Sequence, residues 1–358
     1  MPTAIVTGSG GLVGSESVRS LVEQGYDVIG LDNDMRAYFF GEEASTAATT
    51  AQLRQAYPEF RSLEVDVRDA AAIDAVVRRN RGDLELIVHA AGQPSHDWAA
   101  SEPQTDFAIN ANGTLNLLEA ARRHRPEATF IFCSTNKVYG DRPNTLPLVE
   151  EETRLEIEPG HPFSEGIDTT MSIDRSTHSL FGASKVAADV LVQEYARYFG
   201  MPTACFRAGC LTGARHAGAA SHGFLSYLML CAVTGRRYTV FGYGGKQVRD
   251  NLHSSDVVAA FTAFHADPRP GAVYNLGGGR VSNCSVLEAI AIAERIAGRP
   301  LDRAYDPRPR KGDHRWWISD LAELQRDYPT FAPRYGVEDL LREIHEVKAE
   351  RWMAPSSG

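Results

Sequence analysis

A glycine-rich turn near the start of the sequence constrains the fold more than any other feature. Gly8, Gly11 and Gly14 stand three residues apart. They follow a β-branched segment, Ala4–Thr7, and open a segment with helical periodicity, Leu12–Gln24. Glycines between a strand and a helix leave room for a phosphate at the helix N-terminus, which side chains would block. The chain is therefore expected to begin with a βαβ unit that binds a pyrophosphate, and a tight turn without a ligand is the alternative.

The acidic residue Asp32 indicates which dinucleotide would bind. It follows the second expected strand, Asp27–Leu31, and lies 18 residues beyond Gly14. A carboxylate at this place can accept both hydroxyls of a ribose and repels a 2′-phosphate, so NAD is expected. Asp66 and Val67, after the third strand, can cap the adenine, although an ordinary surface aspartate fits the same pattern.

Short β-branched runs continue to alternate with helical periodicity through the first half of the chain, which is typical of a parallel sheet flanked by helices. Further strands are expected at Leu84–His89, Thr129–Cys133 and Thr203–Arg207, and helices at Ile73–Arg79, Gly113–Arg123 and Gly182–Phe199. The predicted fold class is α/β, a Rossmann-type doubly wound parallel sheet.

The alternation ends after Arg207, where proline, glycine and aromatic residues become more frequent, as in Phe241–Gly245 and Tyr305–Trp317. We expect a smaller C-terminal α/β lobe there that binds substrate and closes over the carboxyl ends of the strands. The predicted domains are 1–206 with part of 240–275 for the cofactor, 207–239 with 276–350 for the substrate, and a tail at 351–358. The long stretch between Asp141 and Leu180 carries prolines and acidic residues and is expected to cover the substrate.

Composition excludes several classes of function. The 358 residues are 43% hydrophobic, enough for a large core, and the net charge of −9 argues against a nucleic-acid-binding face. We expect neither a signal peptide nor a membrane span, and therefore a cytoplasmic protein. The five cysteines are dispersed without zinc or redox spacing, so reduced thiols and no metal site are expected.

Several segments together resemble the extended short-chain dehydrogenase/reductases that act on nucleotide sugars, and the resemblance covers nearly the whole chain. The matching segments are Gly8-x-x-Gly11-x-x-Gly14, His89-Ala-Ala-Gly92, Asn110-x-x-Gly113-Thr114-x-Asn116, Ser134-Thr135-x-x-Val138-Tyr139-Gly140, Gly242-x-Gly244-x-x-Gln247-x-Arg249-Asp250 and Arg310-x-Gly312-Asp313. The resemblance implies NAD as the cofactor and a nucleotide-diphosphate sugar as the substrate.

By position in these segments, the resemblance implies two sets of ligands. NAD is expected on Gly8, Gly10, Gly11, Leu12, Val13, Gly14, Asp32, Asn33, Asp66, Val67, Ala90, Ala91, Gly92, Asn110, Ser134 and Lys185. The substrate is expected on Gln93, Ser95, Asn136, Lys137, Arg207, Arg249, Arg310 and Asp313. Arg249 and Arg310 are expected to face the diphosphate, because a guanidinium fork matches phosphate oxygens. As isolated residues, both would also fit a solvated surface.

Proton transfer in this family uses a Ser or Thr hydroxyl, a Tyr and a Lys. The lysine lowers the pKa of the phenol, and the phenolate takes the proton of a sugar alcohol. Thr135 and Lys185 match the hydroxyl and the lysine. Phe181 stands where the tyrosine is expected, and a phenyl ring cannot transfer a proton.

Four interpretations of Phe181 are open. In the first, another side chain transfers the proton, and each candidate also fits a purely structural role. The candidates are His96, His178, Tyr139 and Lys137. In the second, Lys185 is partly desolvated and acts as the base itself. In the third, a tyrosine from elsewhere, such as Tyr38 or Tyr243, takes the place. In the fourth, the protein binds NAD and a nucleotide sugar without turnover.

The two residues after Thr135 indicate which of the family's reactions to expect. Dehydratases of the family typically place Asp-Glu there to eliminate water, whereas this chain has Asn136 and Lys137. The segment Thr135-Asn-Lys-Val-Tyr-Gly140 resembles that of the CDP-paratose (CDP-tyvelose) 2-epimerase branch. The same resemblance holds for Gln93-Pro94-Ser95-His96-Asp97 and Trp316-Trp317-Ile318-Ser319-Asp320. The resemblance implies an isomerase that oxidises C2 of the sugar, rotates the keto intermediate and returns the hydride to the other face. Another nucleotide-sugar epimerase, or a dehydratase with C4 chemistry, is the alternative.

Members of the family commonly form homodimers through four helices. Here the helices would be Gly113–Arg123 and Gly182–Phe199, whose apolar faces include Leu117, Leu118 and Val190. Packing into the core of a monomer explains the same apolar residues.

Overall fold

The computed structural model describes residues 1–214 and 223–353. The chain forms two compact units. Unit 1 contains Met1–Val138, His178–Ala208 and Val257–Tyr274, and unit 2 contains Tyr139–Thr177, Gly209–Asp256 and Asn275–Gly358. The domain bounds expected from the sequence stay a prediction. Of the expected tail, residues 351–353 belong to a helix and residues 354–358 lie outside the described residues.

Unit 1 is built on a seven-stranded sheet with the order β12-β8-β5-β4-β1-β2-β3. The strands are β1 Thr3–Thr7, β2 Asp27–Leu31, β3 Arg61–Leu63, β4 Leu84–His89, β5 Thr129–Thr135, β8 Thr203–Ala208 and β12 Ala272–Leu276. The pairs from β8 through to β3 are all parallel. The order reverses beside β1, where chains of this topology bind their ligands. The predicted doubly wound α/β fold is confirmed.

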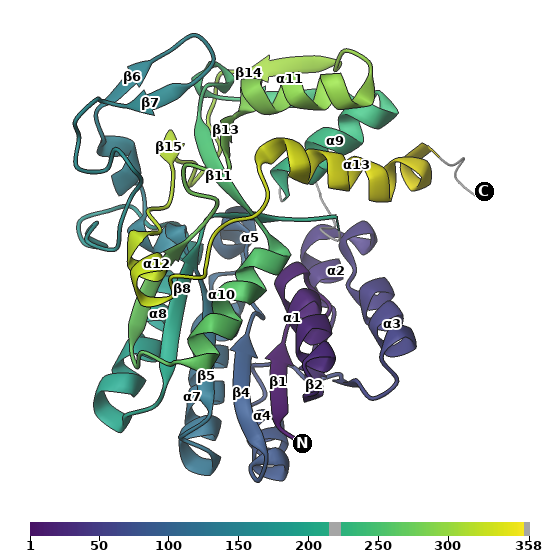
Figure 1. The fold of residues 1–358 in the computed structure, drawn as a ribbon, viewed down its shortest axis with the longest axis vertical. Helices are drawn as coiled ribbons and strands as arrows, with labels where there is room; N and C mark the ends of the chain where they lie inside the picture. The colour runs from purple at the N-terminus through teal and green to yellow at the C-terminus, as the bar shows by residue number, and fades with distance from the viewer. Residues whose placement is uncertain (215–222, 354–358) are drawn as a thin grey trace. The chain divides into compact units, whose positions relative to one another are not determined.

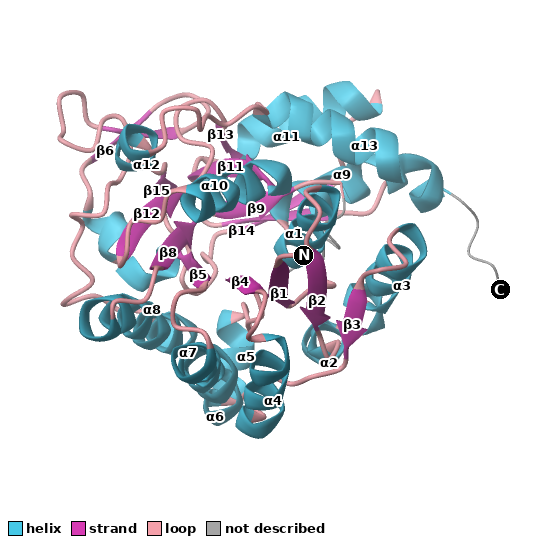
Figure 2. Cartoon of the chain, turned by 60° about the horizontal axis from the view of Figure 1, so that its bottom comes forward, coloured by secondary structure: helices cyan, strands magenta, loops and turns pink. Residues whose placement is uncertain are grey.

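Helices cover both faces of this sheet, with α7 and α8 on one face and α1 and α10 on the other (Figure 2). The helices are α1 Leu12–Glu23, α2 Met35–Phe40, α3 Ala47–Ala56, α4 Ala70–Asn80, α5 His96–Ser101, α6 Pro103–Phe107, α7 Gly113–His124, α8 Ser179–Phe199 and α10 Ser254–Ala266, with the short turns η1 Glu42–Ala44 and η2 Ala108–Asn112. The strands and helices expected in this half are present, and most differ from the expected bounds by only a few residues.

The core of unit 1 explains part of the apolar helix faces. Leu117 and Leu118 of α7 are fully buried among the residues of the sheet, so core packing accounts for them. Val190 of α8 is 38% exposed, and Tyr198 near the end of the same helix is 79% exposed. Some apolar surface of α8 therefore lies outside the core.

Unit 2 has smaller sheets. Its strands are β9 Cys210–Thr212, β11 Val248–His253, β13 Asn283–Ser285 and β15 Trp316–Trp317 in one sheet, β10 Tyr238–Phe241 paired with β14 Arg303–Asp306, and β6 Leu148–Glu150 paired with β7 Leu155–Ile157. Its short turns are η3 Asn136–Tyr139, which begins in unit 1, η4 Arg142–Thr145 and η5 Tyr243–Gly245. Its helices are α9 Phe224–Thr234, α11 Val286–Ala297, α12 Ala322–Asp327 and α13 Val337–Met353 (Figure 1). Helices α9, α11 and α13 share one apolar core.

The stretch expected to cover the substrate is partly ordered into structure of its own. It contains η4 and the antiparallel pair β6 and β7. Its covering role stays a prediction. All five cysteines are free thiols, and the described residues contain no cluster suited to a metal ion and no helix long and apolar enough to cross a membrane.

Candidate active site

The turn between β1 and α1 has a conformation that glycine adopts most readily. Gly8 has a φ of +66°, in the left-handed region. A Cβ atom on Gly14 would lie 2.0 Å from the carbonyl oxygen of Gly8, so no side chain fits there. No side chain caps the first turn of α1 at Gly11, which leaves backbone N–H groups for an anion. The turn therefore fits the pyrophosphate of NAD.

Asp32 follows β2 and contacts this turn. Its Oδ2 accepts a hydrogen bond from the N–H of Gly10 over 2.8 Å, and its Oδ1 accepts one from the Thr46 hydroxyl over 3.1 Å. The N–H of Asp34 also donates to Oδ1 over 2.9 Å, so of the about four acceptor sites of the carboxylate one remains for a ribose hydroxyl. The Thr46 hydroxyl shares its one hydrogen between Asp32 and Asp34, which lies 3.0 Å away and also accepts from the Thr46 N–H over 2.6 Å. Two carboxylates thus stand at this edge, and both would repel a 2′-phosphate.

The residues expected at the adenine lie together. Asn33 donates to Asp66 over 2.9 Å, and Arg68 donates to the same carboxylate at 3.0 Å from Nε and 2.6 Å from Nη2. Burial opposes the charge on Asp66, but the hydrogen bonds from Arg68 and Asn33 lower its pKa below the ordinary value. Val67 packs against Gly113, where a Cβ atom would lie 2.7 Å from Val67 Cγ2. Both the adenine contact and the ordinary ion pair remain compatible with this arrangement.

The segment after β4 passes close to the glycine turn. A Cβ atom on Gly8 would lie 2.9 Å from the backbone nitrogen of Ala91. The N–H of Ala91 donates to the Thr7 hydroxyl over 3.1 Å. Ala90 lies beside this contact, and Gly92 is exposed. The structure therefore brings together the cofactor residues predicted after β1 and after β4.

A buried hydrogen-bond network holds the next residues. The Asn110 amide donates to the carbonyl of Gln93 and to the carboxylate of Asp106, both over 3.0 Å. Gln93 donates to Asp106 over 2.8 Å, and burial raises the pKa of this carboxyl. Asn110 belongs to the single π-turn η2, a distortion that is frequent at functional sites. The network fixes the position of Gln93 and of Ser95, whose N–H donates to the Gln93 side chain.

Lys185 is buried against the carboxyl end of β5. Its Nζ donates to the carbonyl oxygen of Cys133 over 2.7 Å and lies 4.1 Å from the centre of the Phe132 ring. Burial lowers the pKa of Lys185 to about 8. Thr135 ends the same strand, and its Oγ1 accepts a hydrogen bond from the N–H of Lys137 over 3.3 Å. The predicted Thr and Lys are therefore both at this end of β5.

Phe181 lies one helical turn before Lys185 on α8, and only 6% of the residue is exposed. The ring of His96 meets it edge-on, with ring centres 5.1 Å apart and planes at 80°. His96 Nδ1 also lies 2.8 Å from the hydroxyl of Ser179. Of the four side chains expected to replace the tyrosine, His96 is thus brought against the tyrosine position itself.

His178 and Lys137 lie near the start of α8. A Cβ atom on Gly182 would lie 2.9 Å from the carbonyl oxygen of Lys137 and 3.2 Å from the Cβ of His178. The Nε2 atom of His178 is buried and has no hydrogen-bond partner among the residues that the structure describes. Both candidates therefore remain near the tyrosine position.

Tyr139 is fully buried in unit 2 and has a structural environment. Its hydroxyl donates to Asn275 Oδ1 over 2.8 Å, and its ring stacks on Trp317 with centres 5.5 Å apart. Tyr38 donates to Glu102 over 3.0 Å at the surface of unit 1. Tyr243, in unit 2, has a φ of +52° at the start of η5.

Arg207, expected at the substrate, lies in a buried ion pair within unit 1. Its guanidinium donates to Asp189 from Nε over 3.1 Å and from Nη2 over 2.7 Å. The hydroxyl of Ser134 donates to the same carboxylate. Asp189 therefore engages two residues that were expected to bind ligands, and their ligand roles stay predictions.

The remaining residues expected to bind the substrate are Arg249, Asp313, Arg310 and Asn136. Arg249 donates to Asp313 over 3.1 Å in unit 2. Arg310 is exposed, and its guanidinium lies 4.6 Å from the centre of the Phe241 ring. Asn136, in unit 1, is buried at the start of η3. The structure brings Arg249 and Asp313 together as an ion pair, and the expected roles of Arg249 and Arg310 at a diphosphate stay predictions.

Sequence reasoning missed Asp106, Ser179 and Asp189. Asp189 carries a usable signal, because it is an acidic residue four positions after Lys185 on a helix face that is otherwise apolar. Ser179 carries none, since its role depends on a left-handed backbone and on a contact with α5. Asp106 is distinguished only by the network around Asn110.

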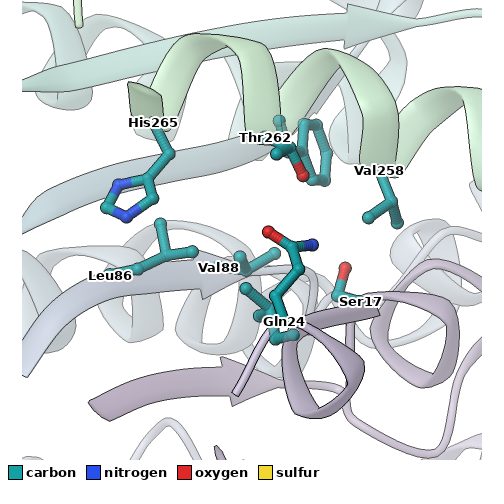
Figure 3. Close-up of a pocket in the computed structure, with 9 residues that line it drawn as sticks. Ser17, Gln24, Leu86, Val88, Val258, Thr262 and His265 are labelled. Carbon is teal, nitrogen blue, oxygen red and sulfur yellow. The ribbon is translucent and has the colours of Figure 1, made fainter. Parts of the chain in front are cut away.

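A pocket elsewhere in unit 1 lies between α1, β4 and α10 (Figure 3). Its lining includes Gln24 and His265. The His265 ring is held by Tyr26 at 2.9 Å and Thr129 at 2.9 Å. None of the predicted cofactor or substrate residues lines this pocket, so it is not part of the candidate site.

Comparisons with a family profile and with individual known proteins agree on one family. The sequence profile of the NAD dependent epimerase/dehydratase family matches residues 4–277. The chain is 29% identical over 354 residues to CDP-paratose 2-epimerase from Salmonella typhi, covering 96% of this chain and 98% of that protein. It is 30% identical to UDP-glucose 4-epimerase from Yersinia pestis, covering 97% and 96%.

Among solved structures, UDP-glucose 4-epimerase from Bifidobacterium longum, in complex with NAD⁺ and UDP, is similar in fold. The TM-score is 0.76 and the identity 23%, over 97% of this chain and 98% of that one. The profile match spans most of the chain, including the glycine turn, Asp32 and the end of β5. The chain therefore belongs to the NAD dependent epimerase/dehydratase family, and its cofactor is NAD.

Proposed function

We propose that this protein is an epimerase that inverts C2 of a nucleotide-diphosphate hexose or deoxyhexose through a transient keto intermediate. The observation that carries the proposal is the pair Asn136 and Lys137 after Thr135, where dehydratases of the family typically have Asp-Glu. The similarity to CDP-paratose 2-epimerase over 96% of the chain supports the same reaction. Without an acid–base pair of its own, elimination of water has no evident route.

When bound, NAD would supply the redox chemistry, taking a hydrogen with its electron pair from the sugar carbon and giving it back. The glycine turn and Asp32 would hold it. Lys185, fixed by the carbonyl of Cys133, places a positive charge near the end of β5, and the Thr135 hydroxyl lies at the same strand end. Arg249 and Arg310 would bind the diphosphate, leaving the sugar to reorient within the site.

Two other functions remain as outcomes of the test. Epimerisation at C4 would follow if the sugar bound with that carbon presented to NAD, and a dehydratase with C4 chemistry would in addition need an acid–base pair in place of the missing Asp-Glu. A protein that binds NAD and a nucleotide sugar without turnover would follow if no group replaced the tyrosine at Phe181.

The experiment is an NMR assay in D₂O of the purified protein with CDP-, GDP-, UDP- and ADP-sugars, with and without added NAD. A C2 epimer that retains protium at C2 is the expected product. Deuterium at the inverted carbon would indicate direct deprotonation, and a 4-keto sugar would indicate a dehydratase. No conversion, together with stabilisation of the protein by NAD and a nucleotide sugar, would indicate a binding protein.

We also propose that the protein works in the cytoplasm as a homodimer that uses the exposed apolar part of α8. Val190 and Tyr198 are the residues that support this surface. Light scattering of the wild type and of Tyr198→Lys would test it, because a charge in the interface should shift the protein toward monomers.

A further inference from the structure

Phe181 stands where the family has its tyrosine, so the usual proton acceptor is missing. A histidine side chain packs against the Phe181 ring. The first residue of α5, His96, is half-buried, and its imidazole packs edge-on against the Phe181 ring at 5.1 Å. The face of α8 that carries Phe181 also carries Lys185, one turn further along. A titratable ring therefore lies beside the position where the family's phenol would stand.

Ser179 fixes one edge of that ring. Its hydroxyl lies 2.8 Å from His96 Nδ1 and accepts a hydrogen bond from the N–H of Gly182 over 3.3 Å. Ser179 has a φ of +60°, a left-handed conformation that costs a residue with a Cβ atom about 1 kcal/mol or more. Residues held in sparsely populated backbone conformations cluster at active sites.

Hydrogen bonds hold the backbone of the residues that precede His96. Ser95 caps α5, accepting a hydrogen bond from the N–H of Trp98 over 3.2 Å. Gln93 donates to the carbonyl oxygen of Ser95 over 2.9 Å and is itself held by Asn110. The histidine therefore stands on a rigid, buried network, as an acid–base residue requires.

We propose, on the basis of the proposed function, that His96 is the acid–base residue of the reaction and that Ser179 is its positioning residue. In the forward step the O–H bond of the sugar hydroxyl breaks, and its proton goes to Nε2 of His96. The hydrogen of the same carbon would leave with both electrons of its C–H bond, which bound NAD would take up, so the carbon would be oxidised to a ketone. After the sugar turns, the reverse step returns both hydrogens.

This assignment sets the direction of the hydrogen bond between the two residues. For Nε2 to accept a proton, Nδ1 must carry one, and Ser179 must accept it. A serine oxygen has two lone pairs, which here take Nδ1–H of His96 and N–H of Gly182. The hydrogen bond made at one ring nitrogen decides which tautomer is present, so Ser179 presents the basic nitrogen to the substrate.

Two of the other candidates, Lys185 and Tyr139, are less well placed for this step. Lys185 is committed to the Cys133 carbonyl, and Tyr139 is fully buried with its hydroxyl on Asn275. The titratable groups that α5 and the helices packed against it carry besides His96 are Arg36, Tyr38, Asp97, Asp106, Lys185, Asp189, Glu194, Tyr195, Arg197 and Tyr198, and Glu102 and His178 flank these helices. These groups set the field around His96, and the variants below leave all of them unchanged.

The first test measures turnover against pH for the wild type, His96→Gln, Ser179→Ala and Ser179→Gly. We expect His96→Gln to lower kcat by about 10²-fold or more. Both Ser179 variants should lower kcat about tenfold or more and move the acidic limb of the kcat profile. Glycine relieves the positive φ and alanine does not, so equal losses of kcat with unequal stabilities separate positioning from folding. Ser101→Ala, at the exposed end of α5, is the matched control and should keep wild-type kcat.

The second test does not use activity. In the protein labelled with ¹⁵N-histidine, the signals missing from His96→Gln identify His96. Neutral His96 should carry its proton on Nδ1 in the wild type, and this preference should be lost in Ser179→Ala.

The outcomes are distinguishable. A wild type that epimerises while His96→Gln keeps kcat within about threefold overturns the acid–base role and leaves the proposed function standing. A wild type without turnover contradicts both the function and the acid–base role. A proton on Nε2 of neutral His96 overturns the positioning role of Ser179 whatever the activity.

Discussion

The ammonium group of Lys185 donates a hydrogen bond to the backbone carbonyl oxygen of Cys133 over 2.7 Å. The carbonyl fixes the charge at the end of β5 without neutralising it. With Phe181 in place of tyrosine, this charge has no phenol pKa to lower. In the proposed reaction, its remaining tasks would be to hold the cofactor and to stabilise the negative charge that develops on the sugar oxygen.

Lys185→Met should therefore lower kcat by about 10²-fold or more. Burial lowers the pKa of Lys185 to about 8, so in the wild type the positive charge is lost as pH rises through that value. The rate should fall on the alkaline side of about pH 8, and a pH–rate profile measured with saturating substrate checks this. A rate that keeps rising well above pH 8 would instead indicate that neutral Lys185 is the base.

The second prediction is that Asp32 determines the choice between NAD and NADP. Asp32→Ser removes the carboxylate that accepts from Gly10 and Thr46, so NAD affinity should fall about tenfold or more and the preference over NADP should shrink. Calorimetric titration of both cofactors checks the change. Because Asp34 remains beside Thr46, we expect only a partial loss of discrimination. The double variant Asp32→Ser, Asp34→Ser should lose more, and equal values for the two variants would show that Asp34 has no part in selection.

Much of the fold could be predicted because its signals are local. The run Ala4–Thr7 and the glycines after it specify a strand and a turn by themselves, and Asp32 follows at a fixed distance. The parallel order of the strands then brings their carboxyl ends to one edge, so a cofactor site could be predicted there, and the family resemblance supplied most of the individual residues expected to bind NAD.

The details of the candidate site depend on tertiary contacts, which are not written in local patterns. His96 could be named only as one of several candidates, because its contact with Phe181 joins residues 85 positions apart. Arg207 matched a ligand position, yet Asp189 on α8 holds it in a buried ion pair. The positive φ of Ser179 has no sequence signal at all, since serine is rare in that conformation.

His89 provides a prediction about stability. The Thr114 hydroxyl donates to the carbonyl of Asn110 over 2.7 Å, so it must accept from Nε2–H of His89 at 2.9 Å. The Thr7 hydroxyl accepts from the N–H of Ala91, so it donates to Nδ1 of His89 over 2.7 Å. The neutral ring is fully satisfied, and a proton on Nδ1 would face another donor.

Burial, assisted by the charge of Lys185, lowers the pKa of His89 from 6.5 to about 3. Between these values the unfolded chain binds a proton that the folded chain does not, so stability is lost as pH falls below 6.5. The loss from this residue should be about 2 kcal/mol between pH 7 and pH 4.5. Urea unfolding at several pH values should show a shallower slope for His89→Gln, although that variant is less stable at pH 7. Parallel slopes for the two proteins would contradict the assignment.

Phe181→Tyr tests whether the missing phenol is a defect or part of the site. If the chain binds its ligands without turnover because it lacks the phenol, restoring the hydroxyl beside Thr135 and Lys185 should create activity or raise it by at least tenfold. If His96 has taken over the proton transfer, the new hydroxyl enters a place where the imidazole already packs at 5.1 Å, and it competes for the same sugar oxygen. We therefore expect kcat to stay level or to fall by up to about tenfold, with NAD affinity unchanged.

Phe181→Leu is the matched control, because it removes the ring that supports His96 and adds no proton acceptor. It should lower kcat through looser positioning alone. A gain of tenfold or more in Phe181→Tyr would show that proton transfer, and not binding, is what the native residue withholds.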